Sequence, residues 1–336
     1  MSTTQSAKPF SFREWNEKRG PANRFWEFVI ERSLLACGLF SIVITLAIVV
    51  VILMGTFNFF ATNAEVVEVN GEKVVEAKVM PAGKIWDRFS YFFVGREWTE
   101  SSGEYSILPL ASATFYVTLI AALVAVPIGL LTATYLSEYA RPWVRAFAKP
   151  TLELLAGIPT VVYGFFAVTV ITPLLAKFIP DLGNPNNLIS GGVVVGIMII
   201  PMIASLSEDS LRAVPRSLRE ASIALGATKF QTSVKVVIPA ALSGIVASFL
   251  LAMSRAIGET MAVTLACGES ARMALDPRQG AATMTSMIVH RAKGDVEHFS
   301  TDYSSLFAVA AVLFFVTLGM NIVAQWVLHR YRQVYQ

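Results

Sequence analysis

Six long apolar runs decide what this chain can fold into. Each is long enough, as a helix, to cross about 30 Å of hydrocarbon. Of the 336 residues, 54% are hydrophobic and 15% charged, and the mean hydropathy is +0.58, above the balance of a soluble domain. The sequence therefore predicts an all-α polytopic membrane protein with six transmembrane helices. The expected spans are residues 33–60, 111–136, 152–177, 190–206, 238–267 and 304–328.

These spans divide the chain into four expected parts. Residues 1–32 form a cytoplasmic segment with an amphipathic helix at the membrane surface, or a polar leader with aromatic anchors. Residues 33–60 form the first transmembrane helix, and residues 61–105 an external insertion. Residues 106–330 form a core with the other five spans, in which residues 207–235 are a cytoplasmic loop.

The placement of basic residues sets the expected orientation. Lys and Arg gather in the N-terminal segment, in the loops 137–150 and 207–235, and in the C-terminal tail. In the loop 61–105, by contrast, acidic residues outnumber basic ones eight to five. Because basic residues favour the cytoplasmic side, both termini are expected there, with loops 61–105, 178–189 and 268–303 outside.

The external insertion has structure of its own. VVEVNGEKVVEA alternates charged and β-branched residues around Asn70-Gly71. This pattern predicts a small extracytoplasmic β-hairpin, since a type I′ turn needs positive φ at both central residues. The aromatic stretch KIWDRFSYFFVGREW follows, and we expect it to rest on the membrane interface with Trp86 and Trp98 at headgroup depth.

The sequence contains no recognisable catalytic constellation. No G-x-x-x-x-G-K-[ST] motif is present for a nucleotide's phosphates, so any ATP must be hydrolysed by another subunit. His290, His298 and His329 lack metal-ligand spacing, and Cys37 and Cys267 lie in or beside apolar runs. No catalytic, cofactor-binding or metal-binding residues are therefore expected, and the chain is not predicted to be an enzyme.

The loop 207–235 contains the start and stop signals of two short helices. Residues 217–225 place Leu218, Ala221 and Leu225 along one face, and Gly226 suits a left-handed cap. Thr228-Lys-Phe-Gln231 then has the form of a capping box that opens a second helix. An ordered amphipathic element of this kind predicts a docking site for a partner.

Two charges stand inside the fifth apolar run, in SRAIGETMAV. Arg255 falls near the middle of the run, where an arginine costs about 2.5–3.5 kcal/mol, and Glu259 could pair with it one helical turn on. One interpretation is a buried ion pair that locks packing. The favoured one is a cationic site on an anion's path, with Glu259 restraining the guanidinium and with Ser254 and Thr260 either as hydroxyl donors or as packing contacts.

The run EASIALGATKFQTSVKVVIPA resembles the EAA loop of ABC-importer permeases. The matching residues are Glu220, Ala221, Gly226 and Pro239. The resemblance implies that the short helix inserts into a cleft of an ATP-binding subunit and transmits its closure to the membrane helices. It also implies that Glu220 faces that subunit and that Gly226 makes the turn.

Two further stretches, SRAIGETMAV and ELLAGIPTVVYG, resemble the PstC-type permeases of phosphate importers. The resemblance implies a type I ABC importer permease fold in a bacterial cytoplasmic membrane and a role in importing inorganic phosphate. The implied partners are a PstA-like second permease, a PstB-like ATP-binding dimer, a PstS-like external phosphate-binding protein and membrane lipid, with no nucleic acid.

Other functions remain open from the sequence. A proton-coupled secondary anion transporter would use Arg255 and Glu259 as a relay. A receptor would bind its ligand at the external hairpin. A permease for sulfate, molybdate or phosphonate would share the EAA loop.

Overall fold

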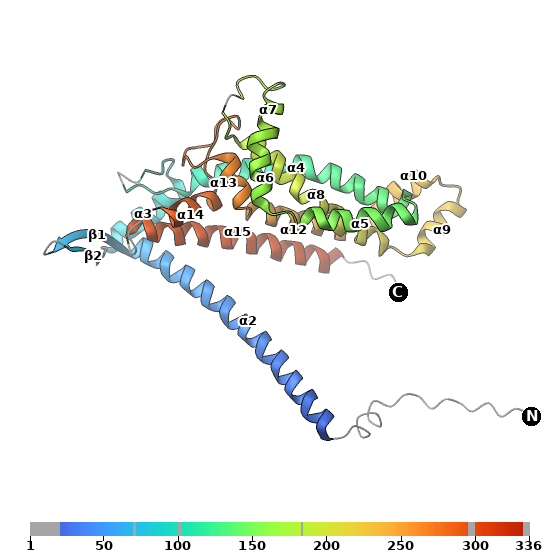
Figure 1. The fold of residues 1–336 in the computed structure, drawn as a ribbon, viewed down its shortest axis with the longest axis horizontal. Helices are drawn as coiled ribbons and strands as arrows, with labels where there is room; N and C mark the ends of the chain where they lie inside the picture. The colour runs from blue at the N-terminus through green and yellow to red at the C-terminus, as the bar shows by residue number, and fades with distance from the viewer. Residues whose placement is uncertain (1–20, 70–71, 100–102, 183, 295–299, 332–336) are drawn as a thin grey trace, which may run out of the picture. The chain divides into compact units, whose positions relative to one another are not determined.

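The structure is a computed structural model that describes most of the chain in five stretches, shown in Figure 1. The described stretches are residues 21–69, 72–99, 103–182, 184–294 and 300–331. The described chain is helical apart from one pair of strands. It divides into two compact units, residues 1–52 and 53–336.

The first unit contains most of the long helix α2 (Pro21–Ala61). The helix is unbroken between residues 32 and 33, so residues 21–32 continue the first predicted span rather than forming a separate helix. Residues 1–20 lie outside the described residues. The segment Trp26–Ala61 is long and apolar enough to cross a membrane, and its most apolar window buries no residue within the protein. Such a surface suits a helix surrounded by lipid or by another chain.

The external insertion begins with an antiparallel strand pair. β1 (Thr62–Val69) pairs with β2 (Glu72–Val79), with Thr62 opposite Val79. Asn70 and Gly71, where the turn is predicted, lie outside the described residues.

A helix, α3 (Ala82–Val94), follows the strands. The two tryptophans differ in their surroundings. Trp86 is 69% exposed, but Trp98 is 6% exposed and packs edge-on against Tyr105, with ring centroids 5.2 Å apart. Trp98 and Tyr105 belong to an aromatic cluster with Phe59 and Phe92. Within the second unit, the insertion therefore packs on α14 (Met284–Lys293) and α15 (Thr301–Tyr331) through this cluster.

The remaining helices all belong to the second unit. They are α4 (Ile107–Thr134), α5 (Pro142–Ala156), α6 (Thr160–Phe166), α7 (Thr172–Leu175), α8 (Leu188–Arg212), α9 (Arg216–Ala224), α10 (Lys229–Thr232), α11 (Ile238–Ala240), α12 (Leu242–Ile257), α13 (Met261–Cys267), α14 (Met284–Lys293) and α15 (Thr301–Tyr331). Three π-helical turns, Tyr135–Tyr139, Ala167–Ile171 and Ser233–Val237, extend or join these helices.

Among the described residues, four helices can cross a membrane unaided, and the number is six if each of two bent helix pairs is one span. The bent pairs correct two predicted runs. The run 152–177 is interrupted after Ala156, where the chain turns by 85°, because Gly157 ends α5 and Pro159 precedes α6. Glu153 therefore lies near the carboxyl end of α5 and not at the start of a span.

The run 238–267 is also not one helix. The chain bends by 69° between the helices that end at Ala240 and begin at Leu242, and a second break separates α12 from α13. The bend at Ala241 was missed because apolar character alone does not show where a helix bends. The break between α12 and α13 was missed because Arg255 and Glu259 were expected to lie one turn apart on a continuous helix.

The contact between α4 and α8 is the centre of the fold. A Cβ atom on Gly192 would lie 2.6 Å from Ile120 Cβ, and one on Gly196 would lie 3.0 Å from the backbone oxygen of Ala121. Gly129 meets Ile203 in the same way. The two backbones approach closely because these glycines have no side chain, which is a common basis of helix packing in membranes.

The loops of the second unit gather at two ends. At one end, Asn187 N donates to Ala266 O and Ile189 N donates to Pro277 O, so loops 176–187 and 268–283 adjoin. At the other end lie α9 and α10 (Figure 1), where Arg219 pairs with Glu138. The grouping of these loops agrees with the alternation that the sequence predicts, although it does not say which end is cytoplasmic.

Adding one methyl group at the α4–α8 contact should destabilise the protein. We expect Gly192→Ala to cost about 1–3 kcal/mol, because overpacking forces side chains or backbone to shift. The measurement is the thermal unfolding of the purified protein. Gly319→Ala is the control, since Gly319 lies in α15 with open space around it, and equal melting temperatures for the two variants would contradict the close contact.

Candidate functional site

The charged segment SRAIGETMAV contains a helix break. α12 ends at Ile257 and Gly258 caps it with φ −85° and ψ 0°. α13 then starts at Met261. A hydrocarbon core offers backbone groups no partner at such a break, so side chains must satisfy them.

Glu259 satisfies backbone groups at this break. It is 7% exposed, and its Oε1 accepts a hydrogen bond from Ala262 N at 3.2 Å. Its backbone oxygen accepts one from Thr285 Oγ1 at 2.6 Å. The predicted Arg255–Glu259 pair is therefore absent among the described residues, because the helix that would bring them one turn apart ends between them, and Glu259 is instead a cap for α13.

Arg255 is left exposed. It forms no ion pair or side-chain hydrogen bond with any residue that the structure describes. Its depth follows from the antiparallel contact of α12 with α8, in which Ser248 Oγ and Ser207 Oγ are 2.7 Å apart. Seven residues beyond Ser248, Arg255 is level with about residue 200, near the middle of α8. A residue at this level would lie near mid-membrane if α8 spans the bilayer, as the sequence analysis expects.

The two predicted hydroxyl donors differ in their surroundings. Ser254 is 8% exposed, so it packs inside the protein. Thr260 is partly exposed, and its Oγ1 donates to Gly258 O at 3.2 Å. The structure thus brings Thr260 to the same break as Arg255 and places Ser254 within the packed face of α12. Gly258 contacts no other helix, only its own turn.

The two helices of the predicted docking element are present. Gly226 has φ +84°, in the left-handed region that glycine tolerates. Both hydrogen bonds of the predicted capping box occur, Gln231 N to Thr228 Oγ1 at 3.2 Å and Thr228 N to Gln231 Oε1 at 2.9 Å. These two local predictions are confirmed. Ser222 and Thr232 join α9 to α10 through their hydroxyls, 2.9 Å apart.

The predicted docking face is divided by the structure. Leu218 packs inward against a cluster that includes Leu211 and Val237, because α9 must cover the end of the bundle. Ala221 and Glu220 are exposed, and Leu225 is 90% exposed. Two apolar side chains that were not predicted extend this surface. They are Ile223 at 56% exposed and Phe230 at 68% exposed.

Arg219 fixes α9 to the end of the bundle. Its Nη2 lies 2.9 Å from Glu138 Oε1 and donates to Leu211 O at 2.8 Å, and Nη1 donates to Val214 O. The side chain of Glu138 is 8% exposed. The sequence pattern indicated only that Arg219 lies off the apolar face, since its partner is 81 residues away.

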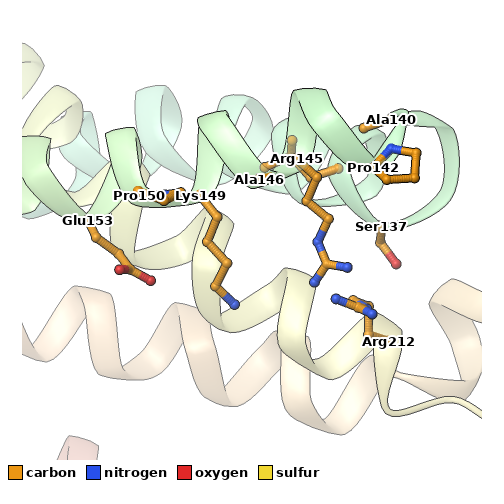
Figure 2. Close-up of a pocket in the computed structure, with 10 residues that line it drawn as sticks. Ser137, Ala140, Pro142, Arg145, Ala146, Lys149, Pro150, Glu153 and Arg212 are labelled. Carbon is orange, nitrogen blue, oxygen red and sulfur yellow. The ribbon is translucent and has the colours of Figure 1, made fainter.

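A buried carboxylate at the same end was also missed. Glu208, in the last turns of α8, is 1% exposed. Arg145 Nη2 lies 2.5 Å from its Oε1, and Lys149 Nζ lies 3.2 Å from Oε2 and 2.6 Å from Asp209 Oδ1. Figure 2 shows Arg145 and Lys149 pointing from α5 to the same side. The available signal was the spacing of Arg145 and Lys149, four residues apart on one helix face.

A metal site has no support in the described part of the chain, where no group of three His, Cys, Asp or Glu side chains could hold an ion. His290 instead lies 3.0 Å from Glu269.

Comparison with known proteins identifies the class. Residues 125–333 match the family described as binding-protein-dependent transport system inner membrane component, and the chain belongs to this family. It is a multi-pass membrane protein and a permease subunit of an ABC importer.

The relatives confirm the resemblance to phosphate permeases. The probable ABC transporter permease protein YqgH of Bacillus subtilis is 39% identical over 213 residues, which cover 62% of this chain and 69% of that protein. The phosphate transport system permease protein PstC of Xylella fastidiosa (strain 9a5c) is 31% identical over 257 residues, 71% of this chain and 78% of that protein.

Solved structures support the fold. A chain of a bacterial alginate ABC transporter, in complex with an alginate pentasaccharide-bound periplasmic protein, has a TM-score of 0.55 at 14% identity and covers 92% of this chain and 99% of its own. A chain of an inward-facing MetNI methionine ABC transporter has a TM-score of 0.50 at 17% identity, with coverages of 76% and 100%.

Because Glu259 caps α13 and does not pair with Arg255, the two side chains should contribute to stability independently. We expect Glu259→Ala to lower the melting temperature, since loss of a capping acceptor costs about 1 kcal/mol, and Arg255→Gln to leave it nearly unchanged. The double variant should show the sum of the two shifts, within about 0.5 kcal/mol. A double variant more stable than that sum would indicate a direct ion pair.

Proposed function

We propose that this chain is the PstC-like membrane subunit of an ATP-driven importer of inorganic phosphate. The family membership supports the importer, and relatives named as phosphate transport permeases support the substrate. The observation that carries the proposal is Arg255, an exposed arginine near mid-membrane without a carboxylate partner among the described residues.

An unpaired arginine facing lipid at this depth would be expensive. Arg255 therefore faces a water-filled path or the second permease, and Thr260 adds a hydroxyl beside it. A guanidinium donates two parallel hydrogen bonds to two oxygens of a tetrahedral oxyanion. Ser254 packs inside the protein and fixes α12, and Glu259 stabilises the start of α13 by capping it. Both residues therefore help to position Arg255.

The coupling role belongs to α9 and α10. Leu225 is 90% exposed, and burial of this large apolar side chain at an interface would be favourable. We assign contact with the ATP-binding subunit to Glu220, Ala221 and Leu225, with Gly226 making the turn. Leu218 lies on the other side of α9 and packs into the bundle. It would transmit a movement of the ATP-binding subunit from α9 to the membrane helices.

The assembly follows from these roles. With each bent pair counted as one, six spans put both termini on the same side of the membrane. We assign that side, with α9 and α10, to the cytoplasm of a bacterial inner membrane, because basic residues favour it. The strand pair and loop 268–283 then face outward, toward an external phosphate-binding protein. A second, PstA-like permease completes the path, and a PstB-like dimer hydrolyses ATP.

Replacing Arg255 should abolish transport without disrupting assembly. In proteoliposomes that contain the whole complex, we expect Arg255→Gln to reduce phosphate uptake at least about tenfold, since a charge-assisted hydrogen bond contributes about 1.5–3 kcal/mol. Arg141→Gln, at an exposed residue outside this site, is the control. Uptake by Arg255→Gln equal to that of the control would refute the role of Arg255.

Competition by other oxyanions tests the substrate separately. We expect unlabelled phosphate to suppress uptake of labelled phosphate far more strongly than sulfate does. Preferential suppression by sulfate or a phosphonate would reassign the substrate and leave the importer itself unchanged.

Replacing Leu225 should separate the permease from its ATP-binding subunit. We expect Leu225→Arg to reduce co-purification of that subunit, because a charge in an apolar cleft is costly to bury. Leu275→Arg is the matched control, since Leu275 is 83% exposed in the loop at the opposite end. Unchanged co-purification of Leu225→Arg would place the contact elsewhere.

A further inference from the structure

A basic hollow lies at the end of the bundle that carries α9. Its volume is about 380 Å³, and it is formed where α8, α9, α10 and the π-helical turn at Tyr135–Tyr139 meet. Five cations and one carboxylate line it. These residues are Arg145, Arg212, Arg216, Arg219, Lys229 and Glu138.

The two carboxylates near the hollow pair closely with only two of its five cations. Glu138 forms an ion pair with Arg219 at 2.9 Å, and Glu208 forms one with Arg145 at 2.5 Å. Arg212 approaches Glu208 only to 3.9 Å, and its side chain is 48% exposed. The hollow therefore keeps a net positive charge after these two ion pairs are counted.

Two further cations contribute to this net charge. Arg216 is exposed and has no partner among the described residues. Lys229 lies over the ring of Tyr139, 5.1 Å from its centroid, which leaves its charge uncancelled. Arg212, Arg216 and Lys229 therefore share one hollow without a close carboxylate of their own.

The guanidinium groups converge on one place. Figure 2 shows Arg145 reaching from α5 toward Arg212 at the end of α8, with Ser137 beside them. Arg145 and Arg212 line both this hollow and the neighbouring one of about 590 Å³ that Figure 2 draws. Glu208 Oε1 lies 2.5 Å from Arg145 and 3.9 Å from Arg212, so one carboxylate faces two guanidinium groups. A single carboxylate does not compensate both charges, and a further anion beside Arg212 would be stabilised.

We propose that this hollow binds a phosphate-class anion, either inorganic phosphate or the phosphodiester headgroup of an anionic lipid. Arg212, Arg216 and Lys229 hold it, since guanidinium and ammonium groups together suit several oxygens of a tetrahedral anion. Basic pockets between membrane helices bind lipid headgroups in the same way. The site is separate from Arg255, because Arg212 lies twelve residues beyond the level of Arg255 on α8, about 18 Å along a helix.

The consequence is a regulatory site beside the docking element. α9 starts at Arg216 and α10 starts at Lys229, so an anion in the hollow contacts both helices that would meet the ATP-binding subunit. Its occupancy would stiffen that element. This inference does not depend on which substrate the permease carries.

The test uses the assembled complex in an Arg255→Gln background, which removes the proposed phosphate site in the path. The test variant is Arg212→Gln with Arg216→Gln. The matched control is Arg141→Gln with Lys235→Gln, which removes the same charge from exposed residues outside the hollow. Both must have the melting temperature of the parent, and Lys229→Gln is the second test variant if the first fails to fold.

Two probes distinguish the source of the anion. Inorganic phosphate is titrated into delipidated complex and followed by ³¹P NMR. Lipid retention is measured by native mass spectrometry after reconstitution in phosphatidylcholine nanodiscs that contain phosphatidylglycerol. We expect the test variant to lose about tenfold in affinity for each guanidinium removed, and the control to keep the parent's affinity.

A loss confined to phosphate identifies a free anion, and a loss confined to phosphatidylglycerol identifies a lipid; either supports the site. Equal binding by the test variant and the control, for both probes, overturns it. Failure of both probes to bind the parent complex also overturns it, since the ATP-binding subunit would then occupy the hollow.

Discussion

Hydrocarbon offers a backbone no hydrogen-bond partner, and this constraint governs the break between α12 and α13. The break between α12 and α13 is tolerated because Glu259 accepts from Ala262 N and Thr285 donates to Glu259 O. The start of α8 is secured by Asn187, whose side chain accepts from Ser190 N at 2.7 Å. The presence of Glu259 in an apolar run is therefore explained by the hydrogen bonds that the backbone needs at the break before α13, without any role in transport.

The same break leaves Arg255 exposed and unpaired among the described residues. With Glu259 committed to α13, the guanidinium has no carboxylate to neutralise it and stays exposed. A continuous helix would have placed the two charges one turn apart and favoured their pairing. The pair of residues that the sequence presents as one unit thus performs two separate tasks, one structural and one that we assign to the anion's path.

Prediction from the sequence succeeded where a feature depends on neighbours in the chain. The capping box at Thr228 and the left-handed Gly226 each rest on a few adjacent residues. The membrane class and the family followed from composition and motif. Pro159 predicts a kink in the run 152–177, and the bend at residues 157–159 confirms it. The bend at residue 241 was missed because apolar runs look alike whether straight or bent. The ion pairs of Glu208 and of Arg219 join residues 59 to 81 positions apart, and local patterns do not specify such distant partners.

The glycine contact between α4 and α8 has a mechanical consequence. Because Gly192 and Gly196 bring the backbones together without intervening side chains, neither helix can slide along the other without a steric clash. The two helices therefore move as one rigid unit, and Arg219 attaches α9 to its end through Glu138 and the backbone oxygens of Leu211 and Val214. A force applied at Leu225 would then be transmitted along both helices, and the bend at residues 157–159 would act as a hinge.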